Sequence, residues 1–459
     1  MSNANLRGAL QLCALAGATA ASARLEQNRE QRVLLVDGRF EVCDEERVVT
    51  QVQVTVNGAN GSASGTDGQG LAMDALAQTA IEVARANAAL NSTLGEDPVL
   101  PLADRVKGDW KSEQGEDPFL VGLDPKLELL RGIERTLRSQ PDVCASRVEL
   151  RTQQRSETHQ TQSRVDVEQT WRRVAVSMSA TACAGEVRAT RRSPGFAWLG
   201  GWEQTQTVPL HAEAQRIATE ASQLLTADPS PQGTFPVVLA PHTLAVVLHE
   251  TFGHIFETGE GDLPDAGRRV ASGRINIVSD PTDGRRVGSY GFDAAGFGTE
   301  RRLLVQEGMM VTPLTGEDGS GAWRSSSPSQ PPALRMSNVD IPVGDSSLGQ
   351  LLAQAEGGLL LDGASRWWLD GQRRNFWVEA EIGWWIEGGG PVRAVNRPAF
   401  GGDTYEFWRS CHDLGLESWE IPFNYCSKRA GTGLLRPVPI SHSVPHGLFV
   451  DVKVGPRAE

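Results

Sequence analysis

Two histidines and a glutamate at close spacing are the residues of this chain best suited to metal chemistry. His249, Glu250 and His254 stand in the run Val-Val-Leu-His-Glu-Thr-Phe-Gly-His. Imidazole nitrogens bind zinc, and a glutamate beside them is suited to take a proton from a zinc-bound water. The pattern predicts a metal-dependent hydrolase in which Glu250 is the general base and not a ligand. The alternative is a pair of hydrogen-bonded histidines in a protein core.

The spacing of the histidines is one residue longer than in the common zinc-peptidase motif His-Glu-x-x-His. On a regular α-helix, positions i and i+5 are separated by about 140° around the axis, which directs the two rings apart. A π-bulge accommodates one extra residue and would bring the rings together. We therefore predict a local distortion within residues 249–254, with Gly253 as the position where the backbone relaxes most easily.

A catalytic zinc site needs a third protein ligand and an open position. The residue types alone leave several candidates, both near the motif and far from it: Glu257, Glu260, Asp262, His242, Cys411, His412, Cys426, His442 and His446. Pro445 excludes a helix that would carry the last two, so we expect His442 and His446 in a loop.

The elements that position these residues belong to an α+β protein of two domains. The chain has 459 residues, too many for one ordinary hydrophobic core. Residues 228–233, which include two prolines, are the best boundary. We expect an N-terminal α/β domain over residues 1–228, which supplies substrate-cavity and dimer contacts, and a β-rich catalytic zinc domain over residues 229–459.

Periodicity gives a coarse assignment of elements within each domain. We predict helices over 71–91, 125–138 and 211–226, an antiparallel sheet over 143–191, and loops over 58–70 and 94–118. In the second domain a buried strand, 235–239, leads into the helix 241–257 that carries the histidines. The remainder reads as short strands broken by Gly and Pro, against which this helix lies.

Charge and cysteine usage narrow the class of protein. The formal net charge of −13 argues against a nucleic-acid partner, and no run approaches the apolar length of a membrane span. Six scattered cysteines without a Cys-x-x-Cys pair predict reduced thiols and a cytoplasmic protein. Residues 8–23 faintly resemble a signal peptide, but their polar interruptions favour a first helix.

Twelve tryptophans include the pairs Trp367–Trp368 and Trp384–Trp385. Such pairs suit either a cleft for an extended peptide or the filling of a core, and we expect core and interface packing.

The motif and several later stretches resemble the TldD/PmbA family of metallopeptidases, whose catalytic members carry His-Glu-x-x-x-His followed by a Glu. His249, Glu250, His254 and Glu257 match that motif. Similarity continues over 230–455 and more loosely before it. The stretches that carry it are 275–293, 304–314, the Arg-x-x-Asn stretch in Leu-Arg-Met-Ser-Asn-Val from Leu334, 376–388 and the Phe-Gly-Gly at Phe400.

The resemblance implies a third zinc ligand near the C-terminus, in a Cys-Gly-Lys-x-Gly-Gln-like context. Cys426, followed by Ser427 rather than Gly, occupies that place, so the resemblance assigns the role to Cys426 and leaves Cys411–His412 as the second choice. It also implies Zn²⁺ as cofactor and a dimer, either a homodimer or a heterodimer with a TldE/PmbA-like subunit.

The function implied is hydrolysis of peptide bonds in unfolded or modified peptides, including peptide maturation. The alternatives are a zinc amidase dedicated to a biosynthetic peptide intermediate, and a non-catalytic partner subunit. The intact His249, Glu250 and His254 count against the non-catalytic reading. Departures from the family after Glu257 and in the C-terminal tail leave the substrate open.

Overall fold

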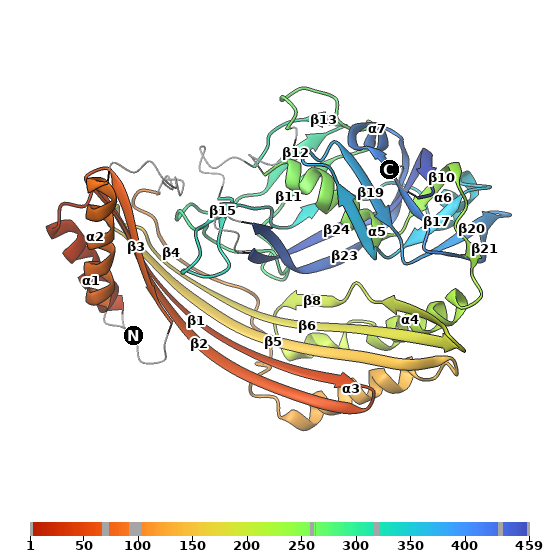
Figure 1. Cartoon of the computed structure of the whole chain (residues 1–459), viewed down its shortest axis with the longest axis horizontal. Coiled ribbons are helices and arrows are strands. Elements are labelled where there is room, and N and C mark those ends of the chain that lie inside the picture. The colour runs from red at the N-terminus through yellow and green to blue at the C-terminus, as the bar shows by residue number, and fades with distance from the viewer. Residues whose placement is uncertain are drawn as a thin grey trace.

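The computed structural model describes residues 3–66, 73–90, 103–257, 261, 263–314, 321–429 and 435–456. Its fold is α+β, as predicted. A long curved sheet from the first half runs beneath the β-rich second half, with α1 and α2 at its far end (Figure 1). The proposed boundary at 228/229 falls just after the last helix of the first half and at the start of β9 (Asp228–Pro229).

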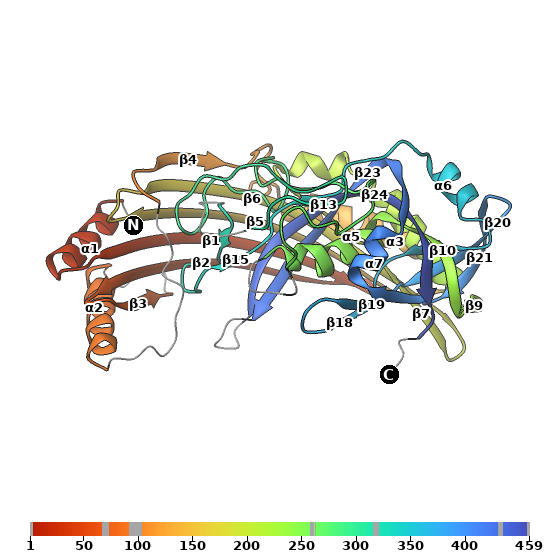
Figure 2. The same cartoon turned by 90° about the horizontal axis from the view of Figure 1, so that it is seen from above.

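The first sheet is built on four unusually long antiparallel strands that lie side by side over most of their length (Figure 2). Its path is β3-β2-β1-β5-β6-β4, and β7 and β8 also pair with β6. The strands are β1 (Ala20–Val36), β2 (Arg39–Val56), β3 (Ala59–Gly65), β4 (Lys107–Lys111), β5 (Val143–Thr161), β6 (Asp166–Ala184), β7 (Val187–Arg192) and β8 (Phe196–Leu199).

Two tight turns explain why β1, β2 and β3 form consecutive hairpins. Asp37–Gly38 and Asn57–Gly58 all have positive φ, from 48° to 79°, which is the signature of two-residue hairpin turns. The loop predicted over 58–70 is therefore wrong for 59–65, which form β3. Its small residues serve packing, since a Cβ at Gly61 would lie 2.1 Å from the carbonyl oxygen of Ala80 on the helix above.

The helices of the first half cover this sheet at its two ends. They are α1 (Asn3–Leu15), α2 (Met73–Ala89), α3 (Leu123–Leu137), the 3₁₀ helix Trp202–Gln206 and α4 (Leu210–Leu224). The first helix is present, although it begins and ends earlier than the predicted 8–23. The predicted loop 94–118 contains the strand β4, which pairs in parallel with β6; residues 91–102 lie outside the described part.

The second half is organised on a ten-stranded mixed sheet of order β18-β19-β22-β24-β10-β17-β20-β21-β9, in which β23 also pairs with β24. Its other strands are β10 (Gly233–Leu239), β17 (Leu359–Asp362), β18 (Arg366–Leu369), β19 (Asn375–Glu379), β20 (Ile382–Glu387), β21 (Gly390–Asn396), β22 (Ala399–Asp403), β23 (Cys411–Arg429) and β24 (Leu435–Val454).

Two small sheets and three helices complete the described part of this half. The strands are β11 (Ile277–Ser279), β12 (Arg302–Gln306), β13 (Met309–Met310), β14 (Trp323–Arg324), β15 (Ala333–Leu334) and β16 (Val339–Asp340). The helices are α5 (Pro241–Leu248), α6 (Leu348–Gln354) and α7 (Thr404–Arg409).

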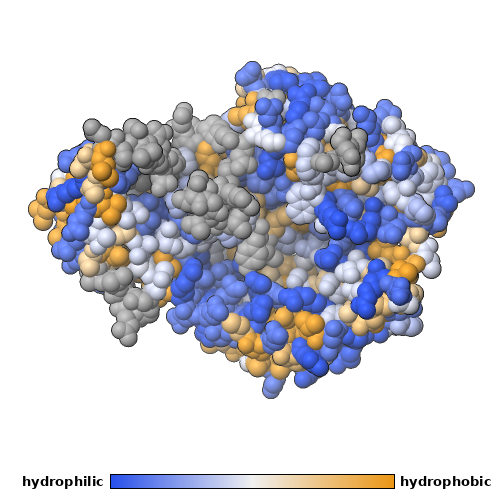
Figure 3. Space-filling view, viewed as in Figure 1, coloured by the Kyte–Doolittle hydropathy of each residue, from blue (hydrophilic) through white to orange (hydrophobic). Residues whose placement is uncertain are grey.

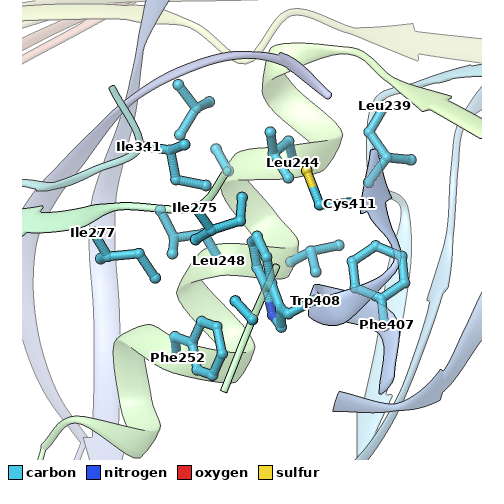
Figure 4. Close-up of a cluster of buried hydrophobic side chains, with 14 of the residues drawn as sticks. Leu239, Leu244, Leu248, Phe252, Ile275, Ile277, Ile341, Phe407, Trp408 and Cys411 are labelled. Carbon is cyan, nitrogen blue, oxygen red and sulfur yellow. The ribbon is translucent and has the colours of Figure 1, made fainter. Parts of the chain in front are cut away.

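The histidine-bearing helix lies inside the largest apolar core. Pro241 opens α5 at its first turn, where its missing N–H costs nothing. Leu244, Leu248 and Phe252 are fully buried and pack against Ile275, Ile277, Phe407 and Trp408 (Figure 4). Cys411 lies in the same cluster beside Leu244. The helix is therefore fixed on every side before any ligand is considered.

The expectation about the cysteines is wrong, and the expectation about the tryptophans is wrong as regards core packing of the pair Trp367–Trp368. Cys144 and Cys183 form a disulfide between β5 and β6, which contradicts the prediction of reduced thiols throughout. Trp367 and Trp368 are 47 % and 43 % exposed on β18, not core residues. Trp384 and Trp385 are half-buried, and Trp385 packs edge-on against Phe235.

The surface is mostly hydrophilic on the face that Figure 3 presents, with apolar side chains gathered at the end formed by α1 and α2. No helix that the structure describes is long and apolar enough to cross a membrane.

A buried ionic cluster joins the two halves. Arg191 on β7 is fully buried, and its guanidinium donates to Glu220 on α4, Asp362 on β17 and Glu381 ahead of β20, over 2.7–2.8 Å. Burial alone would raise the pKa of Asp362, but the positive charges of Arg191 and Arg216 hold it well below its ordinary value. The cluster fixes the long sheet against the second half.

Replacing Arg191 with methionine should destabilise the protein strongly, since it leaves buried carboxylates without their shared cation. We expect the free energy of unfolding to fall by about 3–5 kcal/mol, measured by urea denaturation. Arg192→Met is the matched control, because Arg192 bonds to Glu381 with a side chain that is 60 % exposed. Its loss should cost about 1 kcal/mol or less. Equal shifts for the two variants would contradict the assigned role.

Candidate metal centre

The backbone at the two histidines leaves the α-helical pattern in the way predicted from their spacing. Residues His249–Gly253 form a π-helical segment directly after α5, and the N–H of His254 donates to the carbonyl of His249. This i to i+5 bond takes up the extra residue. Gly253 does not have positive φ; a Cβ there would lie 2.8 Å from Sδ of Met336, so a larger residue would require the Met336 side chain to shift.

The π segment directs both imidazoles at Cys426 on β23. Nε2 of His249 lies 3.1 Å and Nε2 of His254 lies 3.6 Å from Sγ of Cys426. A tetrahedral zinc ion separates a nitrogen ligand from a sulfur ligand by about 3.6 Å, given bonds of about 2.0–2.1 Å and 2.3 Å. The three ligand atoms lie within 4.8 Å of one another, and all three residues are buried. The donor set fits one tetrahedral metal ion with an open fourth position.

Glu257 orients His254 from the side away from Cys426. Its Oε2 lies 3.0 Å from Nδ1 of His254, and its Oε1 accepts from the backbone N–H of Met336. Burial disfavours the charged ring, but the Glu257 carboxylate and Cys426 outweigh it and raise the pKa of His254 to about 10. The Nε2 side of this ring therefore favours a positive charge, whether a proton or a metal ion.

A chain of two hydrogen bonds fixes the tautomer of His249. Burial lowers the pKa of His442 to about 3, so this ring is neutral, and its Nδ1 lies 2.6 Å from the carbonyl of Val339. A carbonyl only accepts, so Nδ1 of His442 carries the proton and its Nε2 must accept. Nδ1 of His249, at 2.9 Å, is then the donor. The lone pair of His249 is left on Nε2, facing Cys426.

The ring of His249 is also held by its surroundings. Phe423 stacks on it with 4.6 Å between ring centroids. Burial, with the neighbouring His254 and His442, lowers the pKa of His249 well below its ordinary value. The ring is thus neutral, which is the form that binds a metal.

The Arg-x-x-Asn stretch braces the sulfur and the strand that carries His442. Nη2 of Arg335 donates to both Sγ and the carbonyl of Cys426, at 2.8 Å each. The side chain of Asn338 accepts from Ser441 and donates to Ser289, so it ties β24 to the loop before β12. Both side chains are buried.

Glu250 points to a different neighbour from the histidines. Nη1 of Arg373, in the turn between β18 and β19, lies 2.6 Å from the carbonyl oxygen of Glu250 and 3.2 Å from its Oε2. The Glu250 carboxyl is 16 % exposed, in contrast to the buried ligand atoms. The bonds from Arg373 therefore hold Glu250 in place, while its carboxylate is still reachable by water.

The remaining candidates for third ligand lie elsewhere. Cys411 is in the apolar core, and burial raises the pKa of its thiol to about 12. His242 stands at the start of α5 and His412 on β23, and neither is among the three residues whose ligand atoms converge. Glu260 and Asp262 lie outside the described residues.

The sequence analysis did not assign a supporting role in the site to His442, Arg335 or Arg373. The loop expected for His442 and His446 is wrong, because both lie on β24. Proline excludes a helix but not a strand next to a bulge, and Pro445 lies where the β23–β24 register shifts. Arg335 could have been found, because it is the arginine of the Arg-x-x-Asn stretch that carries part of the family resemblance. Arg373 had no such signal, since only the folded chain brings it to Glu250.

Comparison with known proteins shows which family the second half of the chain matches. Residues 232–455 match the model of the PmbA/TldA metallopeptidase C-terminal domain. A protein of Methanothermobacter thermautotrophicus named metalloprotease is 28 % identical over 301 residues, or 61 % of this chain and 63 % of that protein. A protein of Buchnera aphidicola named metalloprotease TldD homolog is 30 % identical over 144 residues, 28 % of this chain and 29 % of that protein. The aligned part is thus less than two thirds of either relative.

The whole fold is shared as well. TldE from Thermococcus kodakarensis superposes with a TM-score of 0.78 at 15 % identity, covering 98 % of this chain and 100 % of that one. This identity shows the fold alone. The second half of the chain, residues 232–455, thus matches the PmbA/TldA metallopeptidase C-terminal family, and His249, His254 and Cys426 lie within the matched residues.

His442 should strengthen metal binding without touching the metal. We expect His442→Phe to weaken zinc affinity about 10–100-fold in a chelator-competition titration, because His249 loses the acceptor that fixes its tautomer. His442→Gln offers an amide oxygen at a similar place and should lose less. His446→Phe, on the same strand, is the control and should bind as the wild type does. Unchanged affinity in His442→Phe would refute the role.

Proposed function

We propose that this chain is a zinc-dependent peptidase that hydrolyses unfolded or modified peptides. The observation that carries the proposal is the convergence of two imidazole nitrogens and one sulfur, with Glu250 between the two histidines in sequence. The names of the relatives, metalloprotease and metalloprotease TldD homolog, support the same activity.

His249, His254 and Cys426 would hold the ion. When bound, zinc supplies a Lewis acid for the scissile carbonyl and makes a water ligand more acidic. Residues of the chain itself would transfer the proton and position the ligand atoms. Glu250 takes the proton from the attacking water and passes it to the leaving amine, while the bond from Arg373 keeps its carboxylate in place. Glu257, His442 and Arg335 keep the ligand atoms aimed at one point.

We further propose a cytoplasmic dimer, formed with a second copy or with a TldE/PmbA-like subunit. The shared fold with TldE supports such a partner. The exposed apolar side chains at the end formed by α1 and α2 offer a surface for it.

Glu250→Gln tests the chemistry apart from metal binding. We expect zinc to stay stoichiometric while cleavage of an unfolded peptide slows about 10²–10⁴-fold, the usual contribution of a general base. Glu387→Gln, at an exposed position on β20, should cleave at the wild-type rate. The measurements are metal analysis and kcat by chromatography of the products. A Glu250→Gln variant that holds zinc and cleaves normally would dismiss the mechanism.

Two cysteine variants test the third ligand. Cys426→Ala should lose zinc, since a site with two ligands binds far more weakly. Cys411→Ala should keep one zinc per chain, because that thiol lies in the apolar core. Both thiols are buried, so the pair is matched for the loss of packing. Stoichiometric zinc in Cys426→Ala would show that the ligand set is wrong.

A further inference from the structure

A cavity of about 360 Å³ lies between the long sheet and the second half of the chain. Its floor comes from β1, β5 and β6, and its other wall from residues 287–294, the segment around β14, and β24. We call it the arginine cavity, after Arg24, Arg155, Arg173 and Arg324 in its lining. Figures 1 and 2 both place the neighbouring strand β15 over β1 and β5.

The arginine cavity borders the candidate metal centre without including it. Val438 lines the cavity and is the residue of β24 that pairs with Cys426 on β23. Directly opposite residues of an antiparallel pair project to the same face. His249, His254 and Cys426 are not among the lining residues. A part of the substrate bound in the cavity would therefore lie next to the bond that reacts and would not contain that bond.

The charge of the lining is opposite to that of the whole chain. Five arginines and three carboxylic acids line the cavity, whereas the chain carries a formal net charge of −13. Two of the acids share a single cation, since Nη2 of Arg155 lies 2.7 Å from Glu26 and 2.8 Å from Glu157. The third, Asp293, accepts two backbone N–H groups of its own loop, from Ala295 and Phe297, and one from Trp323 on β14. The excess of positive charge thus faces the cavity.

Two of these guanidinium groups, those of Arg24 and Arg324, donate to backbone carbonyl oxygens in the contacts that the structure describes. Arg24 is 2 % exposed; its Nη2 donates to the carbonyl of Ala294, and its Nε has no partner among the described residues. Arg324 donates to the carbonyls of Met336 and Pro439 and lies over the ring of Tyr290. Burial lowers the pKa of Arg324 to about 10. Neither guanidinium donates a hydrogen bond to a carboxylate in the contacts that the structure describes, so the cost of burying its charge is only partly offset and an anionic ligand would offset more of it.

We propose that the arginine cavity binds a carboxylate of the peptide substrate, through Arg24 and Arg324, next to the scissile bond. A carboxylate matches the fork of a guanidinium, and the volume holds one or two residues rather than a folded chain. The carboxylate comes from the free C-terminus of the peptide or from an acidic side chain. This inference rests on the proposed peptidase function, which it makes more specific.

A binding experiment on the full-length Glu250→Gln protein with zinc tests it without turnover. Fluorescence anisotropy would compare one unfolded peptide in three forms: with a free C-terminal carboxylate, with an amidated end, and amidated with one internal glutamate. We expect at least one carboxylate form to bind about tenfold more tightly than the neutral amide. The form that gains affinity identifies the source of the carboxylate.

Arg324→Gln and Arg24→Gln should each remove most of that preference and leave the affinity for the neutral amide unchanged. Arg324→Lys keeps the charge and should keep part of the preference if the glutamine variant folds poorly. Arg301→Gln is the control, since Arg301 is exposed at the surface. Equal affinity of all three peptides for the parent protein would overturn the proposal, and so would a uniform loss for all three in Arg324→Gln.

The two proposals fail in different ways. A carboxylate preference in a wild-type protein that cleaves no peptide would overturn the peptidase function and leave the cavity assignment standing. Cleavage without any preference would overturn the cavity assignment alone.

Discussion

One hydrogen bond, from the N–H of His254 to the carbonyl of His249, governs the geometry of the candidate site. In a regular helix the same two residues would direct their rings apart by about 140°. The π segment closes that angle, and the buried packing of Phe252 and Met336 around it keeps the segment from relaxing. The positions of Cys426, Glu257 and His442 matter only because this bond has already brought the rings together.

The site is held in shape by the side chains around the three proposed ligands as well as by the ligands themselves. Each histidine has its outer nitrogen bonded to a group that fixes the tautomer, a carboxylate in one case and a neutral imidazole in the other. The two hydrogen-bond partners, Glu257 and His442, have different electrostatic effects on the histidines. Glu257 raises the affinity of His254 for a positive charge, whereas His442 only directs the lone pair of His249. Among the three proposed ligands and the groups bonded to their outer atoms, only Glu257 and the thiol of Cys426 can carry a negative charge to balance a divalent ion.

The local parts of this site were readable from the sequence, and the long-range parts were not. The i, i+5 spacing required the π distortion on geometric grounds, and the structure has it. Cys426 was one of nine candidates by residue type, and the family resemblance selected it. His442 was misread because Pro445 was taken to mean a loop. Residues 59–65 were misread as a loop, because a glycine that allows a helix to pack closely on a strand looks the same in the sequence as a glycine in a loop. The Cys144–Cys183 pair depends on the register of β5 against β6, which no single segment encodes.

The ligands on the π segment and the ligand on β23 are separated by 172 residues of chain. During synthesis the two histidines leave the ribosome long before the sulfur does. On the proposed ligand set, a growing chain has only two of three metal ligands until Cys426 has been made, and also lacks the strand that carries His442. Binding of the metal by all three ligands would then be possible only after the fold is complete. On the proposed function, a partly made molecule would therefore be unable to cleave the unfolded chains around it, its own unfinished chain included.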